Sequence, residues 1–263
     1  MPDSLPTLFV SHGAPTLALE QGVPARRFLA GLGKHFTDIS AVLCVSAHWN
    51  TTRPSVNTIA RPPTIHDFYG FPDELYRITY PAPGSPDLAR RVAGLVEAAG
   101  LPCDRDTGRG LDHGAWVPSM LMFPDATVPV VQLSIQDHLD PALHLALGEA
   151  IAPLRKEGVL VIGSGGAVHP LGDPTVALGE GLRTEIWAIA FNEWLNRAVT
   201  YGDKKSLISY RELAPSAIHA QYYPDHFMPL FTALGAAGPD AKGKIIHQSW
   251  YWGNLGMGAF EFW

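Results

Sequence analysis

The chain of 263 residues is 46% hydrophobic, which is enough for one large core, and we expect a single domain over 1–263. Its 19 Lys and Arg residues against 25 Asp and Glu residues give a net charge of −6, which argues against nucleic acid or an anionic membrane as a partner. No apolar stretch approaches the roughly 20 residues that a transmembrane helix needs. The start shows no signal-peptide pattern, and Cys44 and Cys103 are too few for a disulfide framework. We expect a cytoplasmic protein, either a monomer or a small homo-oligomer.

Short apolar runs bounded by Gly and Pro predict buried strands, and longer segments between them predict helices. Strands are expected at 7–11, 41–46, 128–135, 159–163 and, more weakly, 244–249. Helices are expected at 86–99, 139–156 and 180–201, the last with Leu182, Ile186 and Ile189 on one face at helical spacing. Strands that alternate with helices indicate an α/β protein, and we predict a three-layer αβα sandwich around a mostly parallel or mixed central sheet.

The segment 50–84 is the exception, because it is rich in Pro and aromatic residues and has no clean period. Long irregular segments in compact domains often act as lids or binding loops. The other interpretation is a packed excursion over the surface. The sequence leaves both open, and we take 62–83 as the part that walls a pocket.

Three of the 11 histidines lie at or soon after the ends of predicted strands: His12, His48 and His169. In open α/β sheets the ligand crevice lies outside the carboxyl ends of the strands, so we expect these side chains to converge on one rim. Neutral imidazole is the commonest metal ligand and also serves as an acid or base. A structural role is open for each of them, because their spacing matches no metal motif.

Two further histidines lie in segments suited to a site. His226 falls near the start of a predicted helix, and His113 lies in the polar, glycine-flanked turn 109–116. The Gly-rich segment 163–166 can present His169 to a ligand, or its backbone amides can cradle a phosphate. The remaining histidines are interpreted as surface or structural residues (His35, His138, His144, His247) or as candidates for lining a pocket (His66, His219).

The chain resembles the 4,5-DOPA extradiol dioxygenases, which belong to the class III extradiol ring-cleaving, LigB-like enzymes. Seven motifs carry the resemblance nearly from end to end and occur in the family's order. They lie at 8–15, 46–49, 66–72 with 80–83, 109–118, 129–135, 162–169 and 225–230. The resemblance departs at Gln221, where many relatives carry a histidine, and at 253–260, which follows the family's ending only loosely.

The resemblance implies that His12, His48 and His226 bind the metal, that His169 is the acid–base residue, and that His113 lies beside the substrate. It implies one divalent ion, Fe(II) for turnover, with Zn(II) as the other ion that the site would hold. The substrates would be a small catechol and O2, and oxygen insertion beside a hydroxylated carbon would give a muconic semialdehyde.

Two alternatives share the same residues. Three imidazoles suit zinc, and a zinc hydrolase would use metal-bound hydroxide. A non-catalytic binding protein is the other, since the Memo protein has a related fold. Iron oxygenases of the facial-triad type use two histidines and a carboxylate. Asp225 adjoins His226, but consecutive residues at a helix start are not expected to face the same way.

Overall fold

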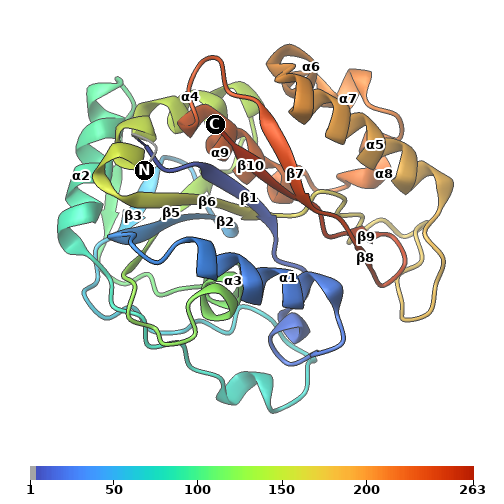
Figure 1. The fold of residues 1–263 in the computed structure, drawn as a ribbon, viewed down its shortest axis with the longest axis horizontal. Helices are drawn as coiled ribbons and strands as arrows, with labels where there is room; N and C mark the ends of the chain where they lie inside the picture. Colours follow the sequence, from blue (N-terminus) through green and yellow to red (C-terminus); the bar gives the residue numbers. More distant parts are fainter. Residues whose placement is uncertain (1–3) are drawn as a thin grey trace.

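The computed structural model describes residues 4–263, and a mixed eight-stranded sheet runs through its centre (Figure 1). Four central strands pair in parallel, whereas β10 is antiparallel to both of its neighbours. In sheet order the strands are β4 (Asp104–Asp106), β3 (Ser55–Asn57), β5 (Val130–Gln136), β2 (Ala41–Thr51), β6 (Val159–Gly165), β1 (Thr7–Ser11), β10 (Ala259–Phe262) and β7 (Gly243–His247). A separate ribbon pairs β8 (Trp250–Tyr251) with β9 (Leu255–Gly256).

Helices cover both faces of this sheet, which makes the three predicted layers. Figure 1 shows α1 and α3 on one side and α4 and α9 on the other. The helices are α1 (Pro24–Leu32), α2 (Pro86–Ala98), α3 (His113–Met122), α4 (Pro141–Ile151), α5 (Ile186–Tyr201), α6 (Lys204–Ile208), α7 (Tyr210–Leu213), α8 (Ala217–Ala220) and α9 (Met228–Ala236). Within 4–263, no helix combines the length and the apolar character that crossing a membrane requires.

The central strands form close to where their apolar runs predict them. Successive side chains of a strand point to opposite faces, and here both faces are buried. Leu43 and Val45 of β2 join the core under α2, α4, α5 and α9, whereas Val42 and Cys44 join the core under α1 and α3. Strands buried on both faces need continuous apolar runs, and that is the pattern the sequence shows.

Two predicted helices are too long. In 139–156, α4 ends at Ile151 and a 3₁₀ turn takes over, because Pro153 cannot donate the next α-helical hydrogen bond. The predicted helix 180–201 begins only at Ile186 as α5, since Gly181 adopts a φ of 76° that interrupts helical geometry.

The face predicted for that helix is also wrong. Leu182, Ile186 and Ile189 are all exposed, and α5 instead buries its opposite side. Phe191 and Leu195 of α5 pack into the core together with Ala188, Ala198 and Val199, which removes this apolar side of the helix from water.

The segment 50–84 is mostly irregular, and its regular parts are the last two residues of β2, the strand β3 and a short 3₁₀ turn at Leu75–Arg77. It is nevertheless anchored. Tyr80 is buried and its hydroxyl donates to the carbonyls of Ser119 and Phe123 at the end of α3. These contacts fix the segment against the C-terminal end of α3.

Candidate metal centre

The parallel strands β1, β6 and β2 are neighbours, and their carboxyl ends meet at one edge of the sheet. His12 leaves β1 directly at its end. His48 lies inside β2, where the pairing with β5 shifts between Ser46 and Asn50. Such a bulge re-aims side chains, and here His48 turns toward His12, with 3.0 Å between their Nε2 atoms. The predicted convergence of strand-end histidines is therefore present.

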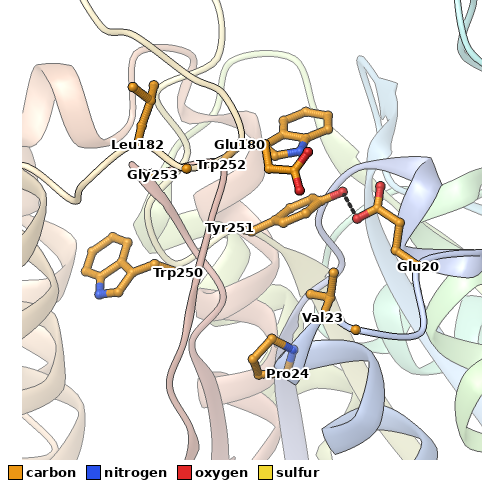
Figure 2. Close-up of a pocket in the computed structure, with 11 residues that line it drawn as sticks. Glu20, Val23, Pro24, Glu180, Leu182, Trp250, Tyr251, Trp252 and Gly253 are labelled. Atoms are coloured by element: carbon orange, nitrogen blue, oxygen red, sulfur yellow. Dashed lines mark hydrogen bonds between the residues drawn. The ribbon is translucent and has the colours of Figure 1, made fainter.

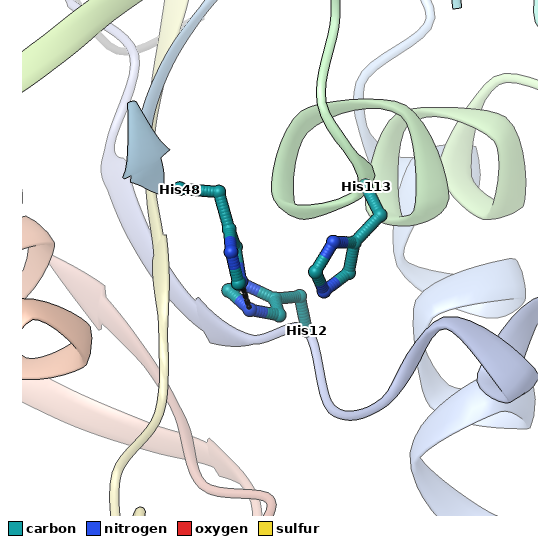
Figure 3. A group of neighbouring side chains, drawn as sticks. All are labelled: His12, His48 and His113. Carbon is teal, nitrogen blue, oxygen red and sulfur yellow. Dashed lines mark hydrogen bonds between the residues drawn. The ribbon is translucent and has the colours of Figure 1, made fainter. Parts of the chain in front are cut away.

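His226 reaches the same point from the 3₁₀ turn Pro224–Phe227 that leads into α9. Its Nε2 lies 3.1 Å from Nε2 of His48. His169, from the loop after β6, stacks flat on His226 with 3.5 Å between the ring centroids. His113 is the first residue of α3, and its ring centroid is 3.9 Å from that of His48. Figure 3 shows the rings of His12, His48 and His113 gathered between the strand ends and the α3 N-terminus.

Hydrogen bonds fix which ring nitrogen carries the proton in His12 and in His226. Ser164 Oγ donates to the Gly114 carbonyl, so it accepts from Nδ1–H of His12 at 2.9 Å. Nδ1–H of His226 donates to Asp225 Oδ1 at 2.9 Å. Both imidazoles therefore direct an unprotonated Nε2 at Nε2 of His48. A proton on Nε2 of His48 can satisfy only one of these two contacts, so at least one pair of nitrogens is left without a hydrogen bond, and a shared cation would stabilise the whole set.

The donor set fits one divalent ion. Imidazole nitrogens bind a metal at about 2.0–2.1 Å, so two ligands of one ion lie about 3 Å apart. The two Nε2 separations agree with that spacing. Ligating histidines also usually give their other N–H to a carboxylate or another acceptor, as His12 and His226 do here. Within 4–263, the groups arranged to hold a metal are His12 with His48 and His113, and His169 with Asp225 and His226.

Asp67 links the irregular segment to this cluster. One of its carboxylate oxygens accepts the backbone N–H of His113 at 2.8 Å, and the other accepts Nδ1–H of the same residue at 2.9 Å. That second oxygen is also 3.4 Å from Nδ1 of His48. Burial opposes ionisation of Asp67, but the hydrogen bonds from His113 and the nearby imidazoles outweigh it and lower its pKa to about 2.

A buried carboxylate supports the cluster from behind. Asp112, which caps α3, is fully buried and accepts from Ser46 Oγ at 2.6 Å and from Arg109 at 2.7 Å. Gln132 of β5 donates to it as well. Because Gly114 has no Cβ, α3 can approach closely: a Cβ there would lie 2.4 Å from Ser46 Oγ. This network holds α3 against the strand that carries His48.

Burial keeps the imidazoles neutral, which is the form that binds metals and accepts protons. Desolvation, reinforced by the neighbouring imidazoles, lowers the pKa values of His12, His48 and His169 well below the ordinary value of 6.5. The same cause lowers the pKa of His226 to about 3. Nδ1 of His169 is buried and has no hydrogen-bond partner among the described residues.

The cluster opens into a cavity of about 240 Å³. Phe68, Phe71, Leu171 and Trp252 form its apolar walls together with Gly13, Ala14 and Pro15. The segment 62–83 thus supplies part of the wall, as expected from its composition. His66 and His219 are not among the residues lining this cavity: His66 packs on Phe68 and Tyr76, and His219 donates to Asp173.

A larger cavity of about 790 Å³ lies next to this one and shares Trp252 with it (Figure 2). Its lining contains none of the clustered histidines. The Tyr251 hydroxyl donates to Glu20 at 2.7 Å, and the Trp252 ring stacks on Tyr251 with centroids 4.7 Å apart. Tyr251, held by Glu20, therefore packs against Trp252, which is also a wall residue of the histidine pocket.

Sequence reasoning missed the carboxylates. Asp225 was expected to face away from His226, yet its side chain turns back and accepts from both the backbone N–H and Nδ1 of His226. Asp67 gave no signal except its place in the 66–72 motif. Gln221 fills a supporting position: its amide donates to the carbonyls of Gly166 and Ala167 at 3.0 Å each, holding the turn before His169.

Comparisons with known proteins agree with this geometry. The family model described as the catalytic LigB subunit of aromatic ring-opening dioxygenase matches residues 6–261. The 4,5-DOPA dioxygenase extradiol of Beta vulgaris is 45% identical over 97% of this chain and 96% of its own length. The protein of that name from Escherichia coli K12 is 37% identical over 88% of this chain and 85% of its own. A crystal structure of an uncharacterized protein from Escherichia coli K12 superimposes with a TM-score of 0.81 at 31% identity, covering 98% of this chain and 99% of that one.

Proposed function

Because the chain belongs to the family of the catalytic LigB subunit of aromatic ring-opening dioxygenases, we propose that it is a metal-dependent extradiol dioxygenase acting on a catechol. The reaction inserts O2 into the ring beside a hydroxylated carbon and yields a muconic semialdehyde. DOPA-like 4,5-cleavage is the form we propose, since relatives named for it align over nearly the whole chain. The observation that carries the proposal is the convergence of three Nε2 atoms, two of them already fixed as unprotonated.

We assign His12, His48 and His226 as the metal ligands. Fe(II) is the ion proposed for turnover, and Zn(II) is an ion that the same nitrogens would also hold. When bound, the ion lowers the pKa of the catechol hydroxyls and leaves positions open for substrate and O2. Ser164 and Asp225 keep two of the ligands in the correct tautomer.

His169 is assigned as the acid–base residue. Burial keeps its imidazole neutral, and its Nδ1 has no partner within the described chain, so the ring can accept a proton from a catechol hydroxyl and return it later. Its flat stacking on His226 holds the ring beside the ligand set. Gln221 restrains the turn that delivers it.

His113 is assigned to hydrogen-bond the substrate. Asp67 accepts the hydrogen of its Nδ1, so Nε2 is the nitrogen left to contact a substrate oxygen. The apolar walls from Phe68 and Trp252 exclude water around the ring, which strengthens these contacts. We also propose that 1–263 is one catalytic domain and that it works in the cytoplasm, where the buried free thiols of Cys44 and Cys103 stay reduced.

The experiment is oxygen uptake by apo-protein reconstituted with Fe(II) or with Zn(II), with DOPA, protocatechuate and catechol as substrates. We expect uptake that depends on iron and a yellow ring-opened product. If the iron-loaded protein takes up no oxygen with any of the catechols, the proposal is wrong. Ester or amide hydrolysis by the zinc-loaded protein would then identify a hydrolase.

A further inference from the structure

The walls of the histidine pocket carry a negative side chain but no Lys or Arg. Of the twelve residues that line it, none is Lys or Arg, and the carboxylate of Asp67 is the one anionic side chain among them. Arg109 contacts the backbone of one lining residue, but its guanidinium donates to Asp112 at 2.7 Å and to the His48 carbonyl at 3.1 Å, and it does not line the cavity. Beyond the histidines, the walls are apolar, from Phe68, Phe71, Leu171 and Trp252.

From this we propose that the pocket selects catechols whose ring carries an uncharged group or a flexible side chain, and that it rejects a carboxylate bonded directly to the ring. The inference rests on the proposed ring-cleaving function and deepens it by naming the substrate class. Leu171 is the wall residue at which this preference is most readily changed. It lines the cavity and is 39% exposed, so it stands at the cavity's mouth.

The physical reason is desolvation. A catechol held by the histidine cluster places its ring between the apolar walls, and the cavity of about 240 Å³ leaves little room for it to shift. A carboxylate fixed on that ring leaves water without gaining a cationic partner, which is costly. A carboxylate at the end of a flexible chain, as in DOPA, can extend through the mouth and keep its hydration.

The test compares two compounds of nearly equal shape, protocatechuate and 3,4-dihydroxybenzamide, which differ in charge at the ring substituent. With the iron-loaded protein we expect kcat/KM for the amide to exceed that for the acid by about 10-fold or more. Binding to the zinc-loaded protein, measured by calorimetry, provides a readout that does not depend on turnover. The same preference is expected in Kd.

Substitutions in the wall sharpen the test. Leu171→Arg supplies the missing cation and should reduce the preference for the amide by about 10-fold. Leu171→Gln is the matched control, since it adds polarity of similar size without charge and should keep the preference. Phe71→Arg introduces a cation from a different loop and should act in the same direction as Leu171→Arg.

The outcomes separate this inference from the proposed function. Equal kcat/KM and equal Kd for acid and amide would overturn the charge selection, while ring cleavage itself would stand. A preference that survives both arginine variants unchanged would show that charge in the wall is not its cause and would also overturn it. Loss of turnover with every catechol would remove the proposed function, and the calorimetric comparison would still decide the inference.

Discussion

Two regions of the molecule bury histidines in opposite ways. At the start of α4, Nδ1–H of His144 donates to the Asp140 carbonyl at 2.7 Å, and its Nε2 accepts the backbone N–H of Gln136 at 3.1 Å. At the sheet edge, Nε2 of His48 instead faces the Nε2 atoms of His12 and His226. His144 is a neutral imidazole in which each nitrogen has a hydrogen-bond partner. His48 faces two nitrogens, and a single proton cannot provide a hydrogen bond to both.

The comparison gives a physical criterion for separating structural histidines from ligands. Burial does not distinguish them, because His144 and His12 are both buried. Donor and acceptor matching does. Where every ring nitrogen has a complementary partner, the histidine needs nothing more, and where nitrogen meets nitrogen, a cation completes the site.

The largest effect is expected for His48→Ala, since His48 contacts both other proposed ligands. Removing a residue that hydrogen-bonds a ligand weakens metal binding by about 10–100-fold, so removing this ligand should weaken it by more than about 100-fold and abolish ring cleavage. Metal content after dialysis and oxygen uptake measure the two losses. His35→Ala is the matched control, because that histidine is exposed and belongs neither to the pocket lining nor to the clustered ligands.

A His48→Ala protein that keeps one tightly bound metal ion and wild-type turnover would show that the cluster is not the metal centre. The comparison with His144 would then lose its basis.

The next largest effect is expected for His169→Ala. General acid–base catalysis contributes typically about 10²–10⁴-fold, so kcat should fall by that factor while the metal stays bound. Single-turnover kinetics with iron-loaded protein and metal analysis of the same sample measure both. Wild-type turnover in this variant would refute the acid–base assignment, and loss of metal would place His169 among the ligands instead.

Much of the fold and part of this site can be predicted from the sequence, and for the same reason. The central strands are continuous apolar runs because both faces are buried, and the rule for parallel sheets then brings His12, His48 and His169 to one edge. The buried face of the predicted helix 180–201 was wrong because Leu182, Ile186 and Ile189 follow one another at the three- and four-residue steps typical of a buried helix face. Ala188, Phe191 and Leu195 follow the same steps and are the residues that pack.

The carboxylates were beyond the reach of the sequence because their contacts depend on irregular backbone. Asp67 lies in a segment without a period, and only the fold carries it to His113. Asp225 turns back on its neighbour through a local geometry that helical spacing rules do not describe. Their effect is to set tautomers, which no pattern of residue types reveals.

A smaller effect is expected for Asp225→Ala, which removes the acceptor that orients His226. Metal affinity should fall by about 10–100-fold, in the range typical for such supporting groups, and excess Fe(II) should restore most of the turnover. Competition with a metal chelator measures the affinity. Asp38→Ala, at an exposed position, is the control. Affinity equal to that of the unmodified protein would mean that Asp225 does not support the ligand.

The smallest effect at neutral pH is expected for a substitution of His144. This histidine makes the free energy of unfolding depend on pH in the acidic range. Burial lowers the pKa of His144 to about 4, below the value of about 6.5 for an unfolded chain. The unfolded state therefore binds the proton first, so the contribution is fully present above about pH 6.5 and is lost as the pH falls toward 4. One pKa unit corresponds to about 1.4 kcal/mol, so the whole window amounts to about 3 kcal/mol.

Urea unfolding of metal-free protein between pH 7.5 and pH 4 measures this contribution. His144→Gln should be the less stable protein at pH 7.5, because it loses packing and a matched hydrogen bond. Its deficit should shrink by up to about 3 kcal/mol toward pH 4, since glutamine does not titrate. Parallel stability curves for the two proteins would mean that His144 is protonated equally in both states. The matching of hydrogen-bond donors and acceptors at the ring nitrogens would then not explain the difference between His144 and the histidine cluster.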